Sequence, residues 1–554
     1  MSRSCELVPP PKSMLMEEGV YRGDLDEIRV DADHAELPAE AYRLIISKEA
    51  VDVYASDLAG AFYAKQTLKQ WAALHSGKLP CVEIEDAPEF PERGYMLDIS
   101  RCRVPTMQTL FELVDLLAHF KYNQLQLYTE HTFAYAGHET VWRNSSPMTA
   151  EQLRELDTYC QERFIELVPN QNSLGHFERW LKHPEYHPYA ECPDGFTHPV
   201  SGVRKTVGST LAPSVESKNL ILDLYAQLLP NFQSNKFNIG CDEPWELGEG
   251  RSGQVRPEAA DGDVFFDWLD GLCSHLSEQG VQPYYWADVA LKYPDKLKRL
   301  SGNGRAVLWG YEPDHPFDEQ CEHLKASQVE FLVSPGDSTW NSLTGRWDIA
   351  RQNIPAAAKA AKRWGSRGLL LTHWGDQGHA QPWPTLLPAI VLGGAYAWNA
   401  DPGAVDVEHG LDRYAFKGQC DGLGAWLCQV GSIDTRLDTL RFNRSLILTL
   451  LRESPFPGDF ELALSEVPLD RLSTEIDSLA NGLSKVDFRG FDNNSLYQEC
   501  ALILEYLRAA KQQLLGEDGK IEPELLKNAE SVWLKRFRSG GLAESMEGYL
   551  FRRD

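Results

Sequence analysis

The sequence lacks several of the features that define large classes of protein. Its eleven cysteines are scattered and form no CxxC pair, and an odd number leaves at least one thiol without a disulfide partner. No run of about 18 apolar residues occurs, so no segment is expected to span a membrane. The opening stretch, MSRSCELVPPPKSMLMEEG, lacks the apolar core and cleavage site of a signal peptide. We therefore expect free thiols and a cytoplasmic location, although a chain trimmed of its signal would look the same.

Basic residues are also in deficit. The chain has 54 Lys and Arg against 81 Asp and Glu, a formal net charge of -27. A surface this acidic repels phosphate backbones and anionic membranes, so neither nucleic acid nor a membrane is an expected partner. The same charge can also reflect solubility alone. Otherwise, with 43% hydrophobic and 24% charged residues, the composition is that of an ordinary globular protein.

The apolar pattern divides the 554 residues into three parts. Residues 1–90 predict a small α+β domain, with strands at 42–47, at 50–55 and from Cys81, and a helix over 58–74. Residues 91–402 predict a barrel of alternating strands and helices. Residues 403–554 predict a helical C-terminal domain, with helices over 433–452, 460–480, 493–515 and 522–536.

The middle part is the most regular. Eight short apolar segments are each followed by a helical segment, as at 106–121, where Leu110, Leu113, Leu117 and Phe120 share one helix face. Eight strand–helix units predict a closed (β/α)8 TIM barrel of the α/β class. A doubly wound open sheet is the alternative, but it usually has fewer strands and a glycine-rich first turn. The eight predicted strands are RGYMLDIS (from Arg93), NQLQLYTE (from Asn123), FIELVPN (from Phe164), KFNIGCDE (from Lys236), QPYYWADV (from Gln282), RAVLWGYE (from Arg305), EFLVSPGD (from Glu330) and GLLLTHWGD (from Gly368).

Acids and tryptophans stand at the carboxyl ends of these strands, where such a barrel places its active site. Carboxylates supply acid, base and hydroxyl-binding groups, and tryptophan faces stack on the apolar face of a sugar ring. Each residue taken alone can be explained by packing, but together they favour a carbohydrate site over a phosphate or nucleotide site. The candidates are Asp98, Arg101, Glu130, Asn170, His176, Asp242, Glu243, Trp286, Asp288, Trp309, Tyr311, the segment Asp337 to Asn341 with Trp340, Trp374 and Asp376.

The adjacent pair Asp242 and Glu243 is the strongest single signal. It ends the apolar run FNIGC, so the two carboxylates are expected to repel each other at the end of a buried strand and one pKa is expected to rise. A helix N-cap beside a surface acid is the structural alternative. Two carboxylates that flank a sugar from opposite faces need about 5 Å between them, and neighbours on one strand do not naturally straddle it. The pair instead suits an acid, Glu243, beside a group that steers a 2-acetamido substituent acting as the internal nucleophile.

These residues resemble glycoside hydrolase family 20, the β-N-acetylhexosaminidases. RGYMLDISRCRVP is similar to the first-strand signature of that family, FNIGCDE to its H/N-x-G-G/C-D-E motif and SLGHFE to its P-G-H segment, with Leu174 in place of the proline. AGAFYAKQTLKQW resembles the helix of the small domain that precedes the barrel. The resemblance covers residues 40–400, and GLLLTHWGDQGHAQPWP resembles a branch without a signal and with a helical C-terminal domain.

The resemblance implies a retaining exo-β-N-acetylhexosaminidase. It would release terminal β-linked GlcNAc or GalNAc from a glycan or glycoconjugate by substrate-assisted catalysis, with no cofactor and no metal. Glu243 is then the general acid/base, and Asp242 orients the acetamido group. Substrate-binding roles fall to Arg101, Glu130, His176, Trp286, Trp309, Trp340, Asn341, Trp374 and Asp376.

One segment departs from the family pattern. The family commonly has Tyr-x-Asp after strand seven, where the tyrosine hydroxyl bonds the acetamide carbonyl, but the segment here is SPGDSTWNS. Either Asn341 or Tyr311 could supply that hydrogen bond.

Two other functions and one assembly remain open from sequence. A metal-dependent barrel hydrolase could use His176, Asp242 and Glu243 as ligands, although no HxH spacing supports it. A carbohydrate-binding protein without catalysis is the other, although the intact acid pair argues against it. We also predict a homodimer, because the C-terminal stretch mixes arginines with Trp533, Phe537, Tyr549, Leu550 and Phe551, and such residues are enriched at interfaces.

Overall fold

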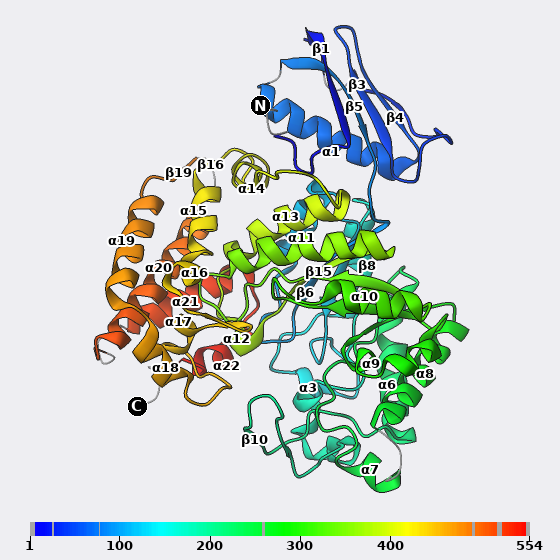
Figure 1. Cartoon of the computed structure of the whole chain (residues 1–554), viewed down its shortest axis with the longest axis vertical. Coiled ribbons are helices and arrows are strands. Elements are labelled where there is room, and N and C mark those ends of the chain that lie inside the picture. Colours follow the sequence, from blue (N-terminus) through cyan, green and yellow to red (C-terminus); the bar gives the residue numbers. More distant parts are fainter. Residues whose placement is uncertain are drawn as a thin grey trace.

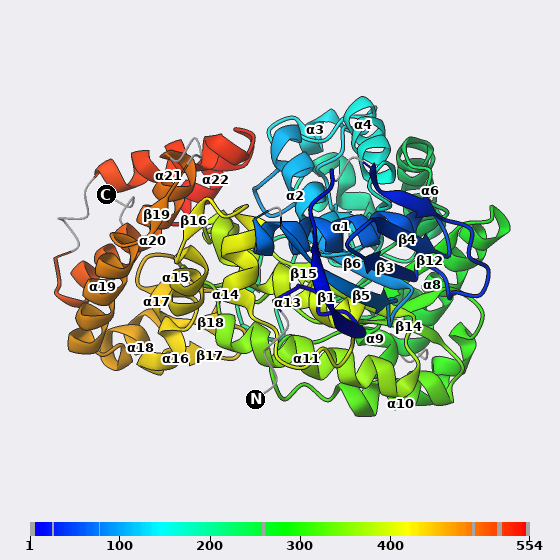
Figure 2. The ribbon, with the colours of Figure 1, turned by 90° about the horizontal axis from the view of Figure 1, so that it is seen from above.

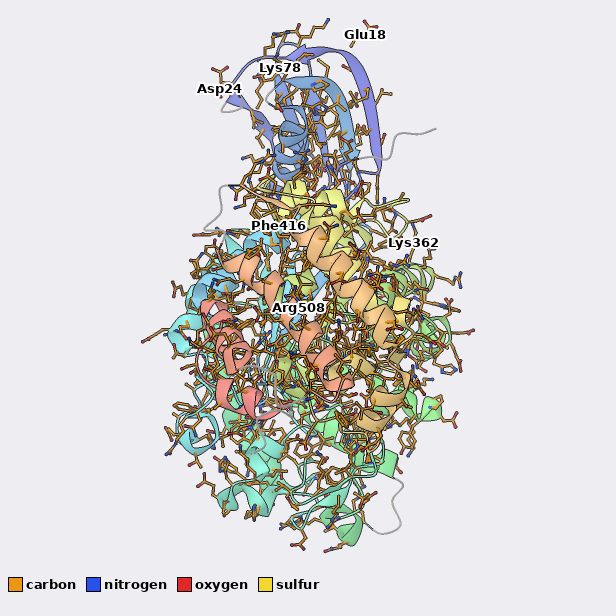
Figure 3. All side chains as sticks on the ribbon, turned by 90° about the vertical axis from the view of Figure 1, so that its left-hand side faces the viewer. Glu18, Asp24, Lys78, Lys362, Phe416 and Arg508 are labelled. Atoms are coloured by element: carbon orange, nitrogen blue, oxygen red, sulfur yellow. The ribbon has the colours of Figure 1, made fainter. Side chains whose placement is uncertain are left out.

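The protein has three parts arranged around a central barrel. The computed structural model describes residues 6–24, 27–76, 78–256, 261–489, 494–517 and 523–549. The N-terminal sheet and its helix lie at one end of the molecule, and the C-terminal helices pack along one side of the barrel (Figure 1). A view turned by 90° shows the C-terminal helices beside the barrel (Figure 2). Arg508 and Phe416 mark that side, and Glu18, Asp24 and Lys78 mark the far end of the N-terminal sheet (Figure 3).

The N-terminal sheet has five strands in the order β1-β5-β3-β4-β2. The predicted strands and helix occur in it as β3 (Tyr42–Ile46), β4 (Val51–Ala55), α1 (Leu58–His75) and β5 (Leu79–Asp86). The side chain of Asp57 caps α1 by accepting a hydrogen bond from the backbone N–H of Gly60. Sequence analysis missed β1 (Ser13–Tyr21) and β2 (Arg29–Asp31), because both are largely exposed and show no apolar alternation.

The barrel is the predicted one. Its eight parallel strands run in the order β11-β12-β13-β14-β15-β6-β7-β8, so the last strand pairs with the first. Where β8 and β11 meet, the strands are joined by one bridge between Asn170 and Asn238. The strands are β6 (Glu92–Asp98), β7 (Gln124–Tyr128), β8 (Glu166–Val168), β11 (Lys236–Asn238), β12 (Gln282–Trp286), β13 (Arg305–Trp309), β14 (Glu330–Ser334) and β15 (Gly368–His373).

Two apolar layers hold the barrel together. One lies between the strands and the helices, which are α2 (Met107–His119), α4 (Ala150–Gln161), α6 (Val215–Leu228), α8 (Asp261–Glu278), α10 (Phe317–Ala326), α11 (Trp347–Trp364) and α13 (Leu387–Trp398). A separate cluster fills the inside of the barrel and includes Met96, Tyr128, Trp286, Trp340 and Trp374. Large aromatic side chains therefore form the floor beneath the carboxyl ends of the strands.

The C-terminal part is helical, but two predicted helices are divided. The stretch 433–452 is α16 (Ile433–Leu437), a hairpin of β17 (Leu440–Arg441) and β18 (Arg444–Ser445), and α17 (Leu446–Thr449). Asp438 and Asn443 have φ of 59° and 57° and turn the chain there. The stretch 460–480 divides before Pro468, because proline cannot continue a helix. The remaining helices are α14 (Val407–Gly410), α15 (Leu423–Val430), α18 (Asp459–Glu466), α19 (Leu469–Leu483), α20 (Asn494–Leu514), α21 (Pro523–Arg536) and α22 (Leu542–Glu547).

The aromatic residues behind the dimer prediction lie inside this chain. Trp533, Phe537 and Tyr549 are each at most 4% exposed, so they pack within the monomer and cannot supply an interface. Leu550 and Phe551 lie outside the described residues. The homodimer stays a prediction that light scattering at micromolar concentration can test. Among the described residues, no helix is both long and apolar enough to cross a bilayer.

Candidate active site

The acid pair stands at the end of the fourth barrel strand, as the sequence predicts. After β11 the chain makes a sharp turn in which Gly240, Cys241 and Glu243 all have positive φ, of 68°, 69° and 46°. Such conformations are costly for residues other than glycine and are concentrated at functional sites. A Cβ on Gly240 would lie 2.6 Å from the side-chain oxygen of Asn172, so glycine is needed there. The turn brings both carboxylates toward one histidine.

Asp242 is buried and held on two sides. Its Oδ1 accepts a hydrogen bond from Nδ2 of Asn172 at 2.8 Å, and its Oδ2 lies 3.2 Å from Nε2 of His176. Burial pushes the pKa of Asp242 up, but the charge of His176 and the two hydrogen bonds outweigh it and hold the pKa below its ordinary value. The sequence predicts that repulsion raises one pKa of the pair without saying which. That residue is not Asp242, whose pKa is lowered because a histidine lies against its carboxylate.

His176 connects the acid pair to the first barrel strand. Its Nε2 lies 3.4 Å from Oε2 of Glu243, and its Nδ1 lies 3.3 Å from a guanidinium nitrogen of Arg101. Burial lowers the pKa of His176, but the charge and hydrogen bond of Asp242 and the hydrogen bond of Glu243 raise it well above its ordinary value. The Nε2 side of the ring therefore faces both carboxylates, and the Nδ1 side faces Arg101.

Arg101 lies at the centre of a second carboxylate group. Its guanidinium lies 3.1 Å from Oδ2 of Asp98 and 3.3 Å from Oε1 of Glu130, which also accepts a hydrogen bond from the hydroxyl of Tyr128. The cation also lies over the rings of Tyr128 and Trp374, at 4.8 and 5.2 Å from their centroids. Burial raises the pKa of Glu130, although Arg101 opposes the shift. Charged donors and acceptors of this kind suit sugar hydroxyls.

Asp376 lies at the start of α12 (Asp376–His379), directly after the last strand, as predicted. Burial raises its pKa, with Arg101 acting in the opposite sense. The Asp376 carboxyl is therefore close enough to Arg101 to feel its charge.

The aromatic residues divide into two groups. Trp309 is half-buried and stacks on Tyr311, with centroids 5.2 Å apart, and Trp374 keeps a small exposed edge. Trp286 and Trp340 have no exposed surface, so they pack beneath the exposed residues of the site and support them from the barrel interior. The sequence predicts substrate contacts for all four tryptophans. A position at a strand end does not by itself distinguish a residue at the open end of the barrel from one in its interior.

The two candidates for the acetamide contact lie differently. The side-chain nitrogen of Asn341 donates to the backbone oxygen of Asn443 in the β17–β18 hairpin at 3.1 Å, which ties it to the C-terminal part. One of the two amide hydrogens of Asn341 is therefore already engaged, and its side-chain oxygen can only accept. The hydroxyl of Tyr311 accepts a hydrogen bond from Nε1 of Trp374 at 2.8 Å and so lies within the aromatic wall. The geometry therefore favours Tyr311 over Asn341 as a donor to a carbonyl.

Sequence analysis missed two residues that the site needs. Asn172 lies two residues after the third predicted strand, and its side chain binds both Asp242 and the backbone N–H of Cys241. Tyr128 ends strand two and supplies a ring to Arg101 and a hydroxyl to Glu130. Neither side chain titrates near neutral pH, and a search for acids, histidines and tryptophans does not select them. Their position at strand ends was the available signal.

Asp288 gives a pH-dependent test of this arrangement. Its pKa is raised to about 7, first by burial and then by the negative charges of Asp242 and Glu243. The unfolded value is about 3.9, so between about pH 4 and pH 7 the folded state binds a proton that the unfolded chain releases. Ionisation of Asp288 therefore lowers the free energy of unfolding progressively as the pH rises from about 4 to about 7.

We expect Asp288→Asn to gain stability relative to the parent between about pH 4 and 7, and to keep a constant difference above pH 7. Urea unfolding of both proteins at pH 5 and pH 8 measures the gain. The same difference in unfolding free energy at the two pH values would contradict the raised pKa.

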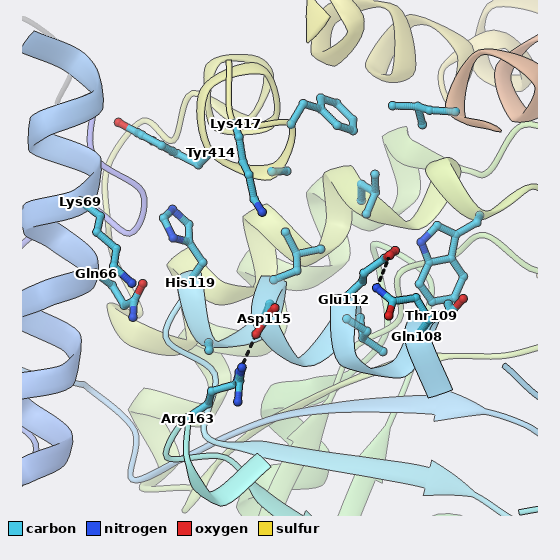
Figure 4. Close-up of a pocket in the computed structure, with 18 of the residues that line it drawn as sticks. Gln66, Lys69, Gln108, Thr109, Glu112, Asp115, His119, Arg163, Tyr414 and Lys417 are labelled. Atoms are coloured by element: carbon cyan, nitrogen blue, oxygen red, sulfur yellow. Dashed lines mark hydrogen bonds and ion pairs between the residues drawn. The ribbon is translucent and has the colours of Figure 1, made fainter. Parts of the chain in front are cut away.

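A large cleft lies away from this site. It measures about 1180 Å³ and is bordered by α1, α2 and the turn Leu411–Ala415 (Figure 4). Its acids are engaged locally, since Asp115 pairs with Arg163 and Glu112 accepts from Gln108. No predicted site residue lines it. Within the described part of the chain, no group of three or more His, Cys, Asp or Glu is arranged to hold a metal ion.

Two family models match the N-terminal sheet and most of the barrel. Residues 9–87 match the model "Glycosyl hydrolase family 20, domain 2", and residues 90–340 match "Glycosyl hydrolase family 20, catalytic domain". The chain is 27% identical to a beta-hexosaminidase of Akkermansia muciniphila over 313 residues, which is 50% of this chain and 62% of that protein. It is 40% identical to a beta-N-acetylhexosaminidase of Cellulomonas fimi over 276 residues, or 45% of this chain and 54% of that protein. The chain thus spans less than two thirds of the length of either relative.

Solved structures share the fold. An exo beta-N-acetylglucosaminidase from Vibrio harveyi in complex with N-acetylglucosamine superposes with a TM-score of 0.62 at 15% identity, covering 78% of each chain. A chitobiase from Flavobacterium johnsoniae superposes with a TM-score of 0.58 at 14% identity, covering 98% of each chain. The two family models together match more than half of the sequence. The first model ends, and the second begins, where the N-terminal sheet meets the barrel. The chain belongs to glycosyl hydrolase family 20.

Proposed function

We propose that this protein is a retaining exo-β-N-acetylhexosaminidase that removes terminal β-linked GlcNAc or GalNAc from glycans or glycoconjugates by substrate-assisted catalysis. The observation that carries the proposal is the contact of two neighbouring carboxylates, Asp242 and Glu243, with the same nitrogen of His176. Two carboxylates held together by one histidine suit a division of labour on one side of a bound sugar. This supports a nucleophile supplied by the substrate itself over a nucleophilic carboxylate.

In the proposed first step, the carbonyl oxygen of the 2-acetamido group attacks C1 as the glycosidic bond breaks. Glu243 gives its proton to the leaving oxygen, which departs as an alcohol. The substrate forms a cyclic oxazolinium whose positive charge faces the carboxylate of Asp242, and Asp242 accepts the hydrogen bond of the acetamide N–H. Because Asn172 and His176 hold Asp242 ionised, its charge is in place before the reaction begins.

In the second step, Glu243 takes a proton from water as the water oxygen attacks C1. The C1–oxygen bond of the cyclic intermediate breaks, and the acetamide is restored. Two displacements at C1 retain the β-configuration. Tyr311 is the better-placed donor for the acetamide carbonyl, and Trp309 and Trp374 offer aromatic surface to the ring.

Hydroxyl recognition falls to the second carboxylate group. Arg101, Glu130 and Asp376 follow the first, second and eighth strands, which adjoin one another in the barrel. Bonds from these groups to the hydroxyls of a terminal residue are consistent with an exo mode of action.

The required acetamide gives the decisive test. An aryl β-glucoside should be turned over at least about 100-fold more slowly than the matching N-acetylglucosaminide, because it lacks the internal nucleophile. A thiazoline mimic of the cyclised intermediate should bind more tightly than the product sugar. Steady-state kinetics measure both effects. Repeating them in the presence of a strong chelator tests for a metal requirement. A covalent ester trapped on Asp242 or Glu243 by a fluorosugar would overturn the substrate-assisted route.

A further inference from the structure

The loop that carries Asp376 is held in a strained conformation. Gln377, Gly378 and His379 follow Asp376 with φ of 59°, 77° and 61°, so three consecutive residues are left-handed. For residues other than glycine, such conformations persist only when the surrounding structure enforces them. The ring of His379 is held at both nitrogens, since Nε2 lies 2.8 Å from Nε2 of His373 and Nδ1 lies 3.3 Å from the backbone oxygen of Arg101. These contacts fix the end of the loop, and the backbone at Gly378 has a partner of its own in the C-terminal part.

Two more substrate-binding loops show the same feature. Cys102, directly after Arg101, has a φ of 70°, and His176 itself has a φ of 58°. The three residues that reach the sugar from strands one, three and eight therefore sit in or beside left-handed backbone. One short helix at the end of the described chain, α22, and the turn before it contact all three loops.

The first contact is with the Asp376 loop. The hydroxyl of Ser545 donates a hydrogen bond to the backbone oxygen of Gly378 at 2.5 Å. A Cβ on Gly378 would lie 2.4 Å from the guanidinium of Arg452, so the loop is packed against the C-terminal part without free space. Helices α12 and α22 lie side by side (Figure 1).

The second contact is with the Arg101 loop. Gly541, with a φ of 76°, lies so close to Cys102 that a Cβ would stand 2.1 Å from the carbonyl oxygen of Cys102. Gly540 donates its backbone N–H to the hydroxyl of Ser146 at 3.0 Å, which fixes the turn before α22 on the barrel. Only glycine permits this approach, so the turn Gly540–Gly541 is shaped for the loop beneath it.

The third contact is with the His176 loop. Arg179, in the short helix α5 (Glu178–Leu181), forms a two-bond pair with Glu544, with both nitrogen–oxygen distances at 2.5 Å. The side chain of Glu544 is half exposed, so this pair alone contributes modestly. Its importance is positional, since it joins α22 to the segment that follows His176.

We propose that α22 and the Gly540–Gly541 turn form a latch that holds the loops of Arg101, His176 and Asp376 in their binding conformation. Glu544 and Ser545 are then positioning residues of the sugar site, although neither touches the sugar. The link to sugar binding rests on the proposed function. The contacts of the latch do not depend on it.

The double variant Glu544→Gln/Ser545→Ala tests the latch. We expect the KM for an aryl N-acetylglucosaminide to rise about 10-fold with little change in kcat, because the loops bind the sugar equally in the ground state and the transition state. Hydrogen–deuterium exchange should accelerate in peptides covering 100–104, 174–180 and 375–380, and stay unchanged in the barrel strands. The matched control is Glu547→Gln/Ser465→Ala, which alters an exposed acid of the same helix and an exposed serine of α18. It should leave KM and exchange as in the parent.

Unchanged exchange in the three loops would overturn the latch, and so would faster exchange with an unaltered KM. If the double variant loses global stability, the single variant Ser545→Ala replaces it. Its KM and the hydrogen–deuterium exchange of the loop 375–380 are then measured. A parent protein that binds or hydrolyses no N-acetylglucosaminide would refute the proposed function, and the exchange experiment would still decide the latch.

Discussion

Replacing Glu243 by glutamine is expected to lower kcat about 10²–10⁴-fold on substrates with poor leaving groups, because the leaving oxygen then departs without a proton. Glutamine keeps the size of the side chain and can adopt the backbone conformation that glutamate adopts, which has a φ of 46°. The loss should shrink as the leaving group becomes more acidic, since a phenol of low pKa departs without help. A series of aryl N-acetylglucosaminides with leaving groups of graded pKa measures this dependence.

The control for this variant is the binding of the thiazoline mimic. The mimic needs no proton from Glu243 to enter the site, so its affinity should change little beside the change in kcat. An equal loss for every leaving group would mean that Glu243 is not the acid of the bond-breaking step.

Replacing Asp242 by asparagine is expected to reduce kcat/KM about 10²–10³-fold, whatever the leaving group, because the charge that balances the oxazolinium is removed. Asparagine can still accept the hydrogen bond that Nδ2 of Asn172 now gives to Oδ1 of Asp242, so the geometry is preserved while the charge is not. The same substitution removes the main cause of the raised pKa of His176, and that pKa should fall.

NMR titration of His176 provides an independent reading of the Asp242→Asn variant. A fall in the histidine pKa together with a uniform loss of activity supports the role of Asp242. A variant that keeps near-parental rates on a good leaving group would refute it, even if the pKa moves. The two variants, Glu243→Gln and Asp242→Asn, should therefore differ chiefly in how their losses depend on the leaving group.

The barrel could be predicted from sequence because its strands are buried on both faces. A strand such as GLLLTHWGD begins as a continuous apolar run and ends in polar residues. The eight strand segments recur at intervals long enough for a helix between them. The exposed strand β1 gives no such pattern and was missed. The helices of the C-terminal part were located, but the hairpin at Leu440–Ser445 was not, since two-residue strands carry too few residues to show a period.

The sequence predicts which residues lie at the site better than it predicts how they are arranged there. Charged residues at strand ends must meet, because the strands are parallel and their carboxyl ends share one face. Whether an aromatic side chain is exposed at the site depends on how far it lies inside the barrel. Trp286 and Trp340 lie deep enough to be fully buried. The pKa of Asp242 depends on where His176 lies, 66 residues away in sequence, and no local pattern carries that information.

The position of α22 along the chain has a consequence for synthesis. All eight barrel strands precede Leu542, so a ribosome extrudes them well before it makes the helix that contacts three of their loops. Domains fold as they emerge, in order from the N-terminus. A nascent chain can therefore complete its barrel while those loops still lack Ser545 and Glu544 as partners. A chain that stops before Leu542 would carry the sugar-binding loops without the helix that holds them.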